Sequence, residues 1–184
     1  MQIVQFTFNP LQENTLVVVD ANKNAVVIDP GCYFREEKEH LANFIAKNEL
    51  KVLALLNTHA HLDHIMGNAF VKEEYGVDLY LHKLDVPTLK MGEQSAHVYG
   101  LDQFESSPLP DKYLEEGQKL KFGEISFDVI FGPGHAPGHV AFYNEEQGIL
   151  INGDILFKGS YGRVDLPGGN FEELKHSITQ KLFK

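Results

Sequence analysis

The feature that most constrains this chain is the stretch "NTHAHLDHIMG", which begins at Asn57. It supplies four potential metal ligands: His59, His61, Asp63 and His64. The aliphatic run "KVLALLN" before it predicts a buried strand, and the apolar spacing of Ile65–Tyr75 after it predicts a helix. Imidazole and carboxylate groups are common ligands for zinc and related metals. A strand-to-helix loop so rich in them predicts a metal site.

Two later segments carry matching groups. The predicted strand "EISFDVIF" runs into "GPGHAPGH", which holds His135 and His139, and "GILIN" runs into Asp154. If these strands are neighbours with the same polarity, their ends meet at one edge, where a carboxylate such as Asp154 can bridge two ions. The predicted ligand set is therefore His59, His61, Asp63, His64, His135 and Asp154. Because "VAFY" after His139 reads as a core strand, we expect His139 to support the ligands rather than to bind metal.

Strands and helices alternate along much of the chain, which predicts a mixed α/β class. The expected strands are "QIVQFTF", "NTLVVVD", "AVVIDP", "KVLALLN", "DLYLH", "EISFDVIF", "HVAFY" and "GILIN". Helical periodicity covers Arg35–Asn48 and a last segment from Phe171 to Leu182. The region Met91–Pro110 lacks a clear pattern, and its "ESSPLP" predicts an exposed loop. No linker or repeat divides the chain, so we expect a single domain over residues 1–184.

Composition excludes several classes of function. With 184 residues, 43% of them hydrophobic, the chain is long enough for one buried core. Its formal charge of −10 disfavours nucleic acid and anionic membrane surfaces as partners. The start "MQIVQFTFNP" has no signal-peptide pattern, so we expect a cytoplasmic protein. Cys32 is the only cysteine, which rules out an internal disulfide, and we expect it to be a small packed residue.

The motifs "THAHLDH", "GPGHAPGH" and "NGD" closely resemble those of the metallo-β-lactamase superfamily. The resemblance implies a four-layer αβ/βα sandwich, with two mixed β-sheets face to face and helices outside. Carried over by position, it implies that His59, His61 and His135 hold a first metal. Asp63 and His64 would hold a second, and Asp154 would bridge the two. The implied cofactor is zinc (Zn2+), as one or two ions, although iron or manganese also suits such ligands.

Two further motifs, "GHAPGHVAFY" and "LFKGSYGRVDLPGG", are similar to those of the single-domain glyoxalase-II-like hydrolases, which act on thioesters. This resemblance implies that four residues border the substrate: Tyr143, Lys158, Tyr161 and Arg163. A basic pair there would suit a carboxylate-bearing thiol such as glutathione. The alternative for Arg163 is that it pairs with Asp165 and only holds the loop.

The expected function is therefore hydrolysis of a small-molecule thioester such as S-lactoylglutathione by a metal-bound hydroxide, which Asp63 orients. One alternative is a mononuclear iron persulfide dioxygenase that uses His59, His135 and Asp154 as its facial triad. A second is a metal-binding scaffold without activity. Its motivation is that members of the family continue past the last helix into a strand and a "GHG"-like turn, whereas this sequence stops at Lys184. We accordingly expect a truncated domain with a weakened second metal site, and the oligomeric state stays open.

Overall fold

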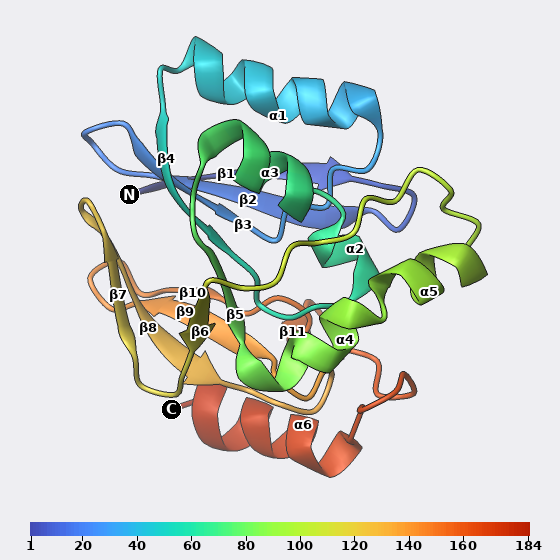
Figure 1. The fold of residues 1–184 in the computed structure, drawn as a ribbon. Coiled ribbons are helices and arrows are strands. Elements are labelled where there is room, and N and C mark those ends of the chain that lie inside the picture. Colours follow the sequence, from blue (N-terminus) through green and yellow to red (C-terminus); the bar gives the residue numbers. More distant parts are fainter.

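Two β-sheets lie face to face in the computed structural model, which describes all 184 residues, and helices cover their outer faces (Figure 1). The first sheet has six strands in the order β1-β2-β3-β4-β5-β6: β1 (Gln2–Phe8), β2 (Glu13–Val19), β3 (Asn24–Ile28), β4 (Lys51–Leu56), β5 (Leu79–His82) and β6 (Lys112–Leu114). The second has four in the order β10-β9-β8-β7: β7 (Lys119–Phe122), β8 (Ile125–Phe131), β9 (Val140–Asn144) and β10 (Ile149–Ile151). A small hairpin follows: β11 (Leu156–Phe157) and β12 (Ser160–Tyr161).

The helices form the outer layers and one rim. They are α1 (Arg35–Lys47), α2 (Leu62–Ile65), α3 (Asn68–Tyr75), α4 (Val86–Lys90), α5 (Gly92–Val98) and α6 (Phe171–Ser177). Helices α1 and α3 cover the first sheet, and α6 covers the second (Figure 1). The expected αβ/βα sandwich is thus confirmed. None of the helices is both long and apolar enough to cross a membrane.

The direction of the strands places the future site at one edge. Strands β1 to β3 form an antiparallel meander, and β3, β4, β5 and β6 then run parallel to one another. Parallel neighbours end at the same edge, so the loops after β3 and β4 meet there. The second sheet is antiparallel throughout, which differs from the expected mixed sheet, because its strands follow one another through short connections.

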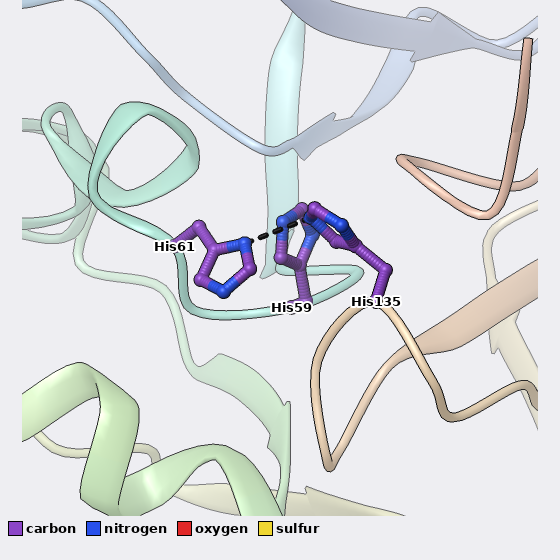
Figure 2. Close-up of side chains that lie close together, drawn as sticks. All are labelled: His59, His61 and His135. Atoms are coloured by element: carbon purple, nitrogen blue, oxygen red, sulfur yellow. Dashed lines mark hydrogen bonds between the residues drawn. The ribbon is translucent and has the colours of Figure 1, made fainter. Parts of the chain in front are cut away.

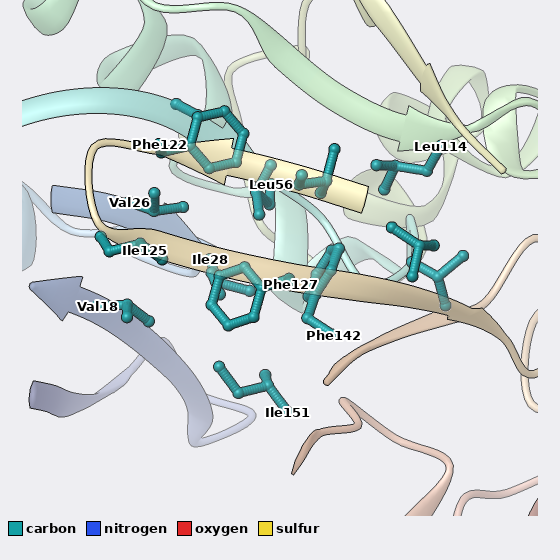
Figure 3. Packing of buried hydrophobic residues seen from close by; sticks show 14 residues of the cluster. Val18, Val26, Ile28, Leu56, Leu114, Phe122, Ile125, Phe127, Phe142 and Ile151 are labelled. Carbon is teal, nitrogen blue, oxygen red and sulfur yellow. The ribbon is translucent and has the colours of Figure 1, made fainter. Parts of the chain in front are cut away.

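The main core fills the space between the sheets (Figure 3). Phe127 and Phe142 lie at its centre, with ring centroids 5.8 Å apart, and pack among aliphatic side chains from the first sheet. Successive residues of β3 alternate between this core and the layer under α1, because strand side chains point to opposite faces. Val26 faces the opposite sheet, whereas Val27 packs towards the helices. Both faces of β3 are therefore buried, as its unbroken apolar sequence indicates.

The helix expected over Ile65–Tyr75 begins later, as α3 at Asn68, and Gly67 separates it from the short helix α2, which carries Asp63 and His64. The Gly67 N–H donates to the Pro30 carbonyl at 2.6 Å, and a Cβ at Gly67 would overlap the sulfur of Cys32. The break thus reflects close contact with the loop after β3. Cys32 itself is fully buried, and burial raises the pKa of its thiol to about 12.

The region Met91–Pro110 contains more structure than the expected loop. Helix α5 occupies Gly92–Val98 directly after α4, and strand β6 follows the irregular segment. The last helix agrees with its periodicity: Leu174 is fully buried, and the chain continues beyond Ser177 as a wider helical turn over Ile178–Leu182. Helices α4 and α5 are short and flank the edge where the strands end.

Candidate metal centre

Three histidines from two loops converge at this edge (Figure 2). His59 and His61 lie in the loop between β4 and α2, and His135 lies in the loop between β8 and β9. One ring nitrogen of each lies within 4.8 Å of the others. The closest pair is His61 Nδ1 and His135 Nε2, which are 2.8 Å apart. Residues 74 positions apart in the sequence thus form one cluster.

The hydrogen bonds around the cluster select which ring nitrogens carry protons. His135 Nδ1 is 2.7 Å from the carbonyl of Arg163, to which it donates. A neutral imidazole has one N–H, so His135 Nε2 presents a lone pair to the cluster. The Thr58 hydroxyl donates to Asp29 at 2.6 Å and therefore accepts from His59 Nδ1 at 3.0 Å. His59 Nε2 likewise keeps its lone pair.

These groups fit a divalent metal ion. His59 Nε2 is buried and has no hydrogen-bond partner, which costs about 1–3 kcal/mol unless a ligand satisfies it. Burial and the neighbouring histidines hold the pKa of His59 well below its usual value and lower that of His61 to about 3. Both rings are thus neutral at pH 7, the state in which imidazole binds metal. A metal ion is the ligand that this set of nitrogens suits.

A second group of ligands lies beside the first. His64 Nε2 is 3.6 Å from Asp63 Oδ2 and 3.5 Å from Asp154 Oδ1. The other oxygen of Asp154 is 3.5 Å from His135 Nε2, so this carboxylate lies between the two groups. Burial acts to raise the pKa of Asp154, but the hydrogen bond and charge of His64 lower it to about 2. All six predicted ligands are therefore brought together, with Asp154 in a position to bridge two ions.

Asp29, which the sequence analysis did not single out, lies behind both groups. It follows β3 and has a left-handed backbone with φ of 49°. Its carboxylate accepts hydrogen bonds from the backbone N–H and the hydroxyl of Thr58, at 2.7 and 2.6 Å. Its Oδ2 also lies 3.2 Å from His64 Nδ1. Asp29 therefore orients His59 through Thr58 and places a carboxylate oxygen beside His64.

Asp85 is a second such residue, at the end of the segment that joins β5 to α4. Its two oxygens accept the N–H of Ala60 at 2.8 Å and of Gly138 at 2.6 Å. One of these amides lies between His59 and His61, and the other lies in the turn that carries His135. The carboxylate is fully buried, and burial raises its pKa to about 6. Asp85 thus fixes the separation of the two histidine-bearing loops.

Glu13 is a third buried acid that the sequence analysis missed. It is 3% exposed and accepts a hydrogen bond from the Thr15 hydroxyl at 2.8 Å. Its second oxygen has no hydrogen-bond partner and lies 4.0 Å from His64 Nδ1. Burial raises the pKa of this carboxyl well above its usual value. The ligand His64 is therefore backed by two carboxyl groups.

His139 lies beneath the cluster with both ring nitrogens in use. Its Nε2 accepts the N–H of Asp154 at 3.1 Å, and its Nδ1 lies 3.1 Å from the carbonyl of Val140. The ring also stacks on His59, with centroids 4.5 Å apart. His139 thus holds Asp154 and His59 in place and has no free lone pair for a metal.

The four residues expected at the substrate have different positions. Lys158 lines a cavity of about 550 Å³ next to Asp63, His64 and Asp154, whose walls combine polar groups with apolar side chains such as Ile151 and Phe157. Tyr161 is half exposed in the small hairpin and packs against Phe171. Arg163 forms two hydrogen bonds of 2.7 Å to Asp165, the alternative considered for it, while its carbonyl accepts from His135.

Tyr143 requires a correction, because the structure does not bring it to the cluster. It lies on β9, where it pairs with Asp128 on one side and Leu150 on the other. Its side chain lines a separate hollow with Lys119 and Glu145. Only the start of β9, at Val140, lies near the site, and Tyr143 is three residues further along the strand.

Comparisons with known proteins agree with this geometry. A family model described as the metallo-β-lactamase superfamily matches residues 8–184. Hydroxyacylglutathione hydrolase GloC of Haemophilus influenzae is 35% identical over 99% of this chain and 84% of its own length. The crystal structure of TTHA1623 in a di-iron-bound form has a TM-score of 0.87 at 41% identity and covers 98% of this chain and 86% of its own. That of BLEG-1 B3 metallo-β-lactamase has a TM-score of 0.85 at 34% identity, over 98% and 85%.

Proposed function

Because the chain belongs to the metallo-β-lactamase superfamily, we propose that it is a metal-dependent hydrolase that cleaves thioesters such as S-lactoylglutathione. The reaction adds water across the acyl carbon–sulfur bond and releases a carboxylic acid and a thiol. The observation that carries the proposal is the convergence of His59, His61 and His135 beside the Asp63, His64 and Asp154 group. The similarity to a hydroxyacylglutathione hydrolase supports the choice of thioester over other acyl substrates.

We propose zinc as the metal, as one or two ions. The donor set of neutral imidazoles and carboxylates suits zinc, and it also suits iron and manganese. The similarity to a protein with a di-iron-bound form makes iron the main competitor. A divalent ion at this site would lower the pKa of water to about 7 and polarise the substrate carbonyl.

Asp63 is the residue proposed to orient the attacking water. Its side chain is 24% exposed, whereas that of neighbouring His64 is 6% exposed, so Asp63 is the more exposed of these two ligands, both of which line the larger cavity. A carboxylate there accepts a hydrogen bond from the water and directs its lone pair at the acyl carbon. The departing thiolate is a stable anion, because thiols have a pKa near 8.5, and it requires little assistance from an acid.

The larger cavity is the proposed position of the thiol part of the substrate. Lys158 is exposed at its rim, and Gln12, Asn14 and Asn152 add uncharged polar groups. Lys158 supplies a cation for a thiol that bears a carboxylate, as glutathione does. Because Arg163 is already paired with Asp165, Lys158 is the cation proposed to bind the substrate.

The test is metal analysis of protein purified without chelator, together with two activity assays. We expect zinc in the protein and hydrolysis of S-lactoylglutathione, with no oxygen uptake on glutathione persulfide. His61→Ala separates the two chemistries, because His61 is a ligand in the hydrolase but lies outside the set of His59, His135 and Asp154 that an iron dioxygenase would use. Hydrolysis should be lost in this variant. One iron per chain, with oxygen uptake that survives His61→Ala, would overturn the proposal.

A further inference from the structure

A second cavity, of about 120 Å³, opens beside His61 and Asp63. It lies between α4–α5 and the segment that holds Leu166 and Pro167. Its walls are mainly uncharged, with contributions from Leu62, Met91, Ser95, Tyr99, Leu166 and Pro167. The larger cavity described above shares Leu11 and Asp63 with it. The metal centre is therefore flanked by two cavities that differ in size and in charged lining, since Glu13, Asp29 and Lys158 line only the larger one.

We propose that the smaller cavity binds the acyl chain of the substrate and restricts it to short, uncharged groups. This inference rests on the proposed function, since it assigns the two halves of a thioester to the two cavities beside one centre. The acyl carbon would then lie beside Asp63, which both cavities share. The thiol part would extend past Asp154 towards Lys158.

The lining explains why an uncharged chain belongs there. No lysine, arginine or glutamate lines the smaller cavity, and its only charged neighbours are the metal ligands themselves. A carboxylate or ammonium group on the acyl chain would lose its hydration there without gaining a partner. The hydroxyls of Thr88 and Ser95 can accept one polar group, such as the hydroxyl of a 2-hydroxyacyl chain. Small-molecule sites commonly combine apolar walls with a few such polar groups.

Leu11 forms the boundary between the two cavities, since it lines both. It lies in the turn between β1 and β2, which Asn9 fixes in place. The Asn9 amide donates to the carbonyls of Asp63, at 3.0 Å, and Gly31, at 2.9 Å, while its oxygen accepts the Leu11 N–H at 3.0 Å. Asn9 thereby links Leu11 by hydrogen bonds to the backbone of Asp63, the residue proposed to orient the water. A substrate that spans the two cavities must pass Leu11 at this point.

The volume sets the length of chain that fits. At about 120 Å³, against about 550 Å³ for the larger cavity, the smaller cavity suits a short acyl chain, of butanoyl rather than octanoyl length. Ser95 lies on its wall, and a larger side chain there would fill the space that such a chain occupies. Met91, which is 43% exposed, lines the cavity from the turn between α4 and α5.

The test compares acetyl, butanoyl and octanoyl thioesters of one thiol, with metal-loaded protein. We expect kcat/KM to be highest for butanoyl and to fall at least about tenfold for octanoyl. Ser95→Leu should lower the butanoyl-to-acetyl ratio by about tenfold, and Met91→Ala should raise the octanoyl-to-butanoyl ratio. The matched control is Gln94→Leu, which adds the same side chain at the adjacent, exposed position of α5 outside the cavity. It should leave all ratios unchanged.

A binding measurement on metal-free protein keeps the two proposals distinguishable. The chain has three methionines, and of these only Met91 lines the cavity. With methionine methyl groups labelled for NMR, S-butyl-N-acetylcysteamine, which cannot be hydrolysed, should shift Met91 and leave Met1 unmoved. Ser95→Leu should abolish the shift. The proposed acyl cavity would be overturned by either of two results. One is hydrolysis whose butanoyl-to-acetyl ratio of kcat/KM is the same in Ser95→Leu, and the other is a Met91 methyl signal that does not shift. If no thioester is hydrolysed while Met91 shifts, the proposed function fails and the binding cavity stands.

Discussion

At the scale of single residues, Asp29 has the widest influence on the metal centre. Its carboxylate accepts hydrogen bonds from Thr58 and through Thr58 orients His59. Oδ2, the oxygen that accepts the Thr58 hydroxyl, also lies 3.2 Å from His64 Nδ1. Carboxylates in this position fix the orientation of a ligating imidazole and increase its basicity. One buried side chain therefore supports ligands of both groups.

We predict that Asp29→Asn weakens metal binding by about 10–100-fold, because an amide cannot accept all of these hydrogen bonds. The measurement is competition with a chromophoric chelator. Asp20→Asn is the matched control: Asp20 accepts the N–H groups of Asn22 and Asn24, at 2.8 and 2.9 Å, in a turn that contains no ligand. It should reduce stability without changing metal affinity. Equal losses of affinity in the two variants would contradict the role given to Asp29.

The same residues show what the sequence allowed us to predict. His59, His61, Asp63 and His64 are contiguous, so their chemistry is visible in the sequence itself. Asp29 and Asp85 act on residues that are distant in sequence and come near only through the fold, so nothing next to them in the chain marks them. Resemblance alone places Tyr143 at the substrate, whereas the direction of β9 takes it elsewhere.

At the scale of elements, the centre depends on loops that contribute ligands from separate places in the fold. Asp85 joins two of them, since its oxygens accept the N–H groups of Ala60 and Gly138. A Cβ at Gly138 would lie 2.6 Å from the Asp85 nitrogen, so this close approach requires glycine. The segment after β5 thus contributes to the site without supplying a ligand.

We predict that Asp85→Asn lowers the free energy of unfolding by about 1–3 kcal/mol, because an amide turns one acceptor into a donor that faces an N–H. Burial raises the pKa of Asp85 in the folded protein to about 6 from 3.8, so the stability linked to its proton is present at low pH and is lost as the pH rises through about 6. The difference in the free energy of unfolding between the wild-type protein and Asp85→Asn should therefore decrease by about 1 kcal/mol between about pH 5 and about pH 7.5. Denaturant unfolding of metal-free protein at several pH values measures this. A difference that increases with pH would contradict the raised pKa of Asp85.

Helices α4 and α5 are the elements that the sequence did not predict. Each is a short helix of at most seven residues, and α5 begins with Gly92, so neither has the length or propensity that makes a helix visible in a sequence. The structure explains their presence: Leu89 and Ala96 are buried against the loop that carries the ligands. The proposed acyl cavity could not be expected before these helices were known.

At the scale of the whole molecule, the apolar core between the sheets holds the strands in place, and the metal ligands lie at the edge where the strands end. The strand pattern was sufficient to predict the mixed α/β class, because β-branched runs and their alternation depend on local sequence. The pairing of β8 and β9 in a second, antiparallel sheet is a long-range property. That pairing is what brings His135 to His61.

We predict that metal removal lowers the melting temperature by about 5–10 °C. An ion present at about a hundredfold above its dissociation constant stabilises the native state by about 2.7 kcal/mol, and each kcal/mol shifts the transition by about 2–4 °C in a chain of this size. Calorimetry with and without EDTA measures the difference. His59→Ala, which lacks a central ligand, should show little response to EDTA. If EDTA lowered the melting temperature of the wild-type protein and of His59→Ala by the same amount, the metal would bind elsewhere.

The division of the ligands into a contiguous set and two distant ones bears on how this protein folds. His61 and His135 are 74 residues apart, so the unfolded chain cannot hold them together without closing a long loop. The four ligands between His59 and His64 remain neighbours even when the chain is unfolded. An ion can therefore bind the unfolded chain weakly, and the gain in stability should level off once the metal concentration exceeds that weaker affinity. Beyond that concentration, further metal occupies folded and unfolded chains alike.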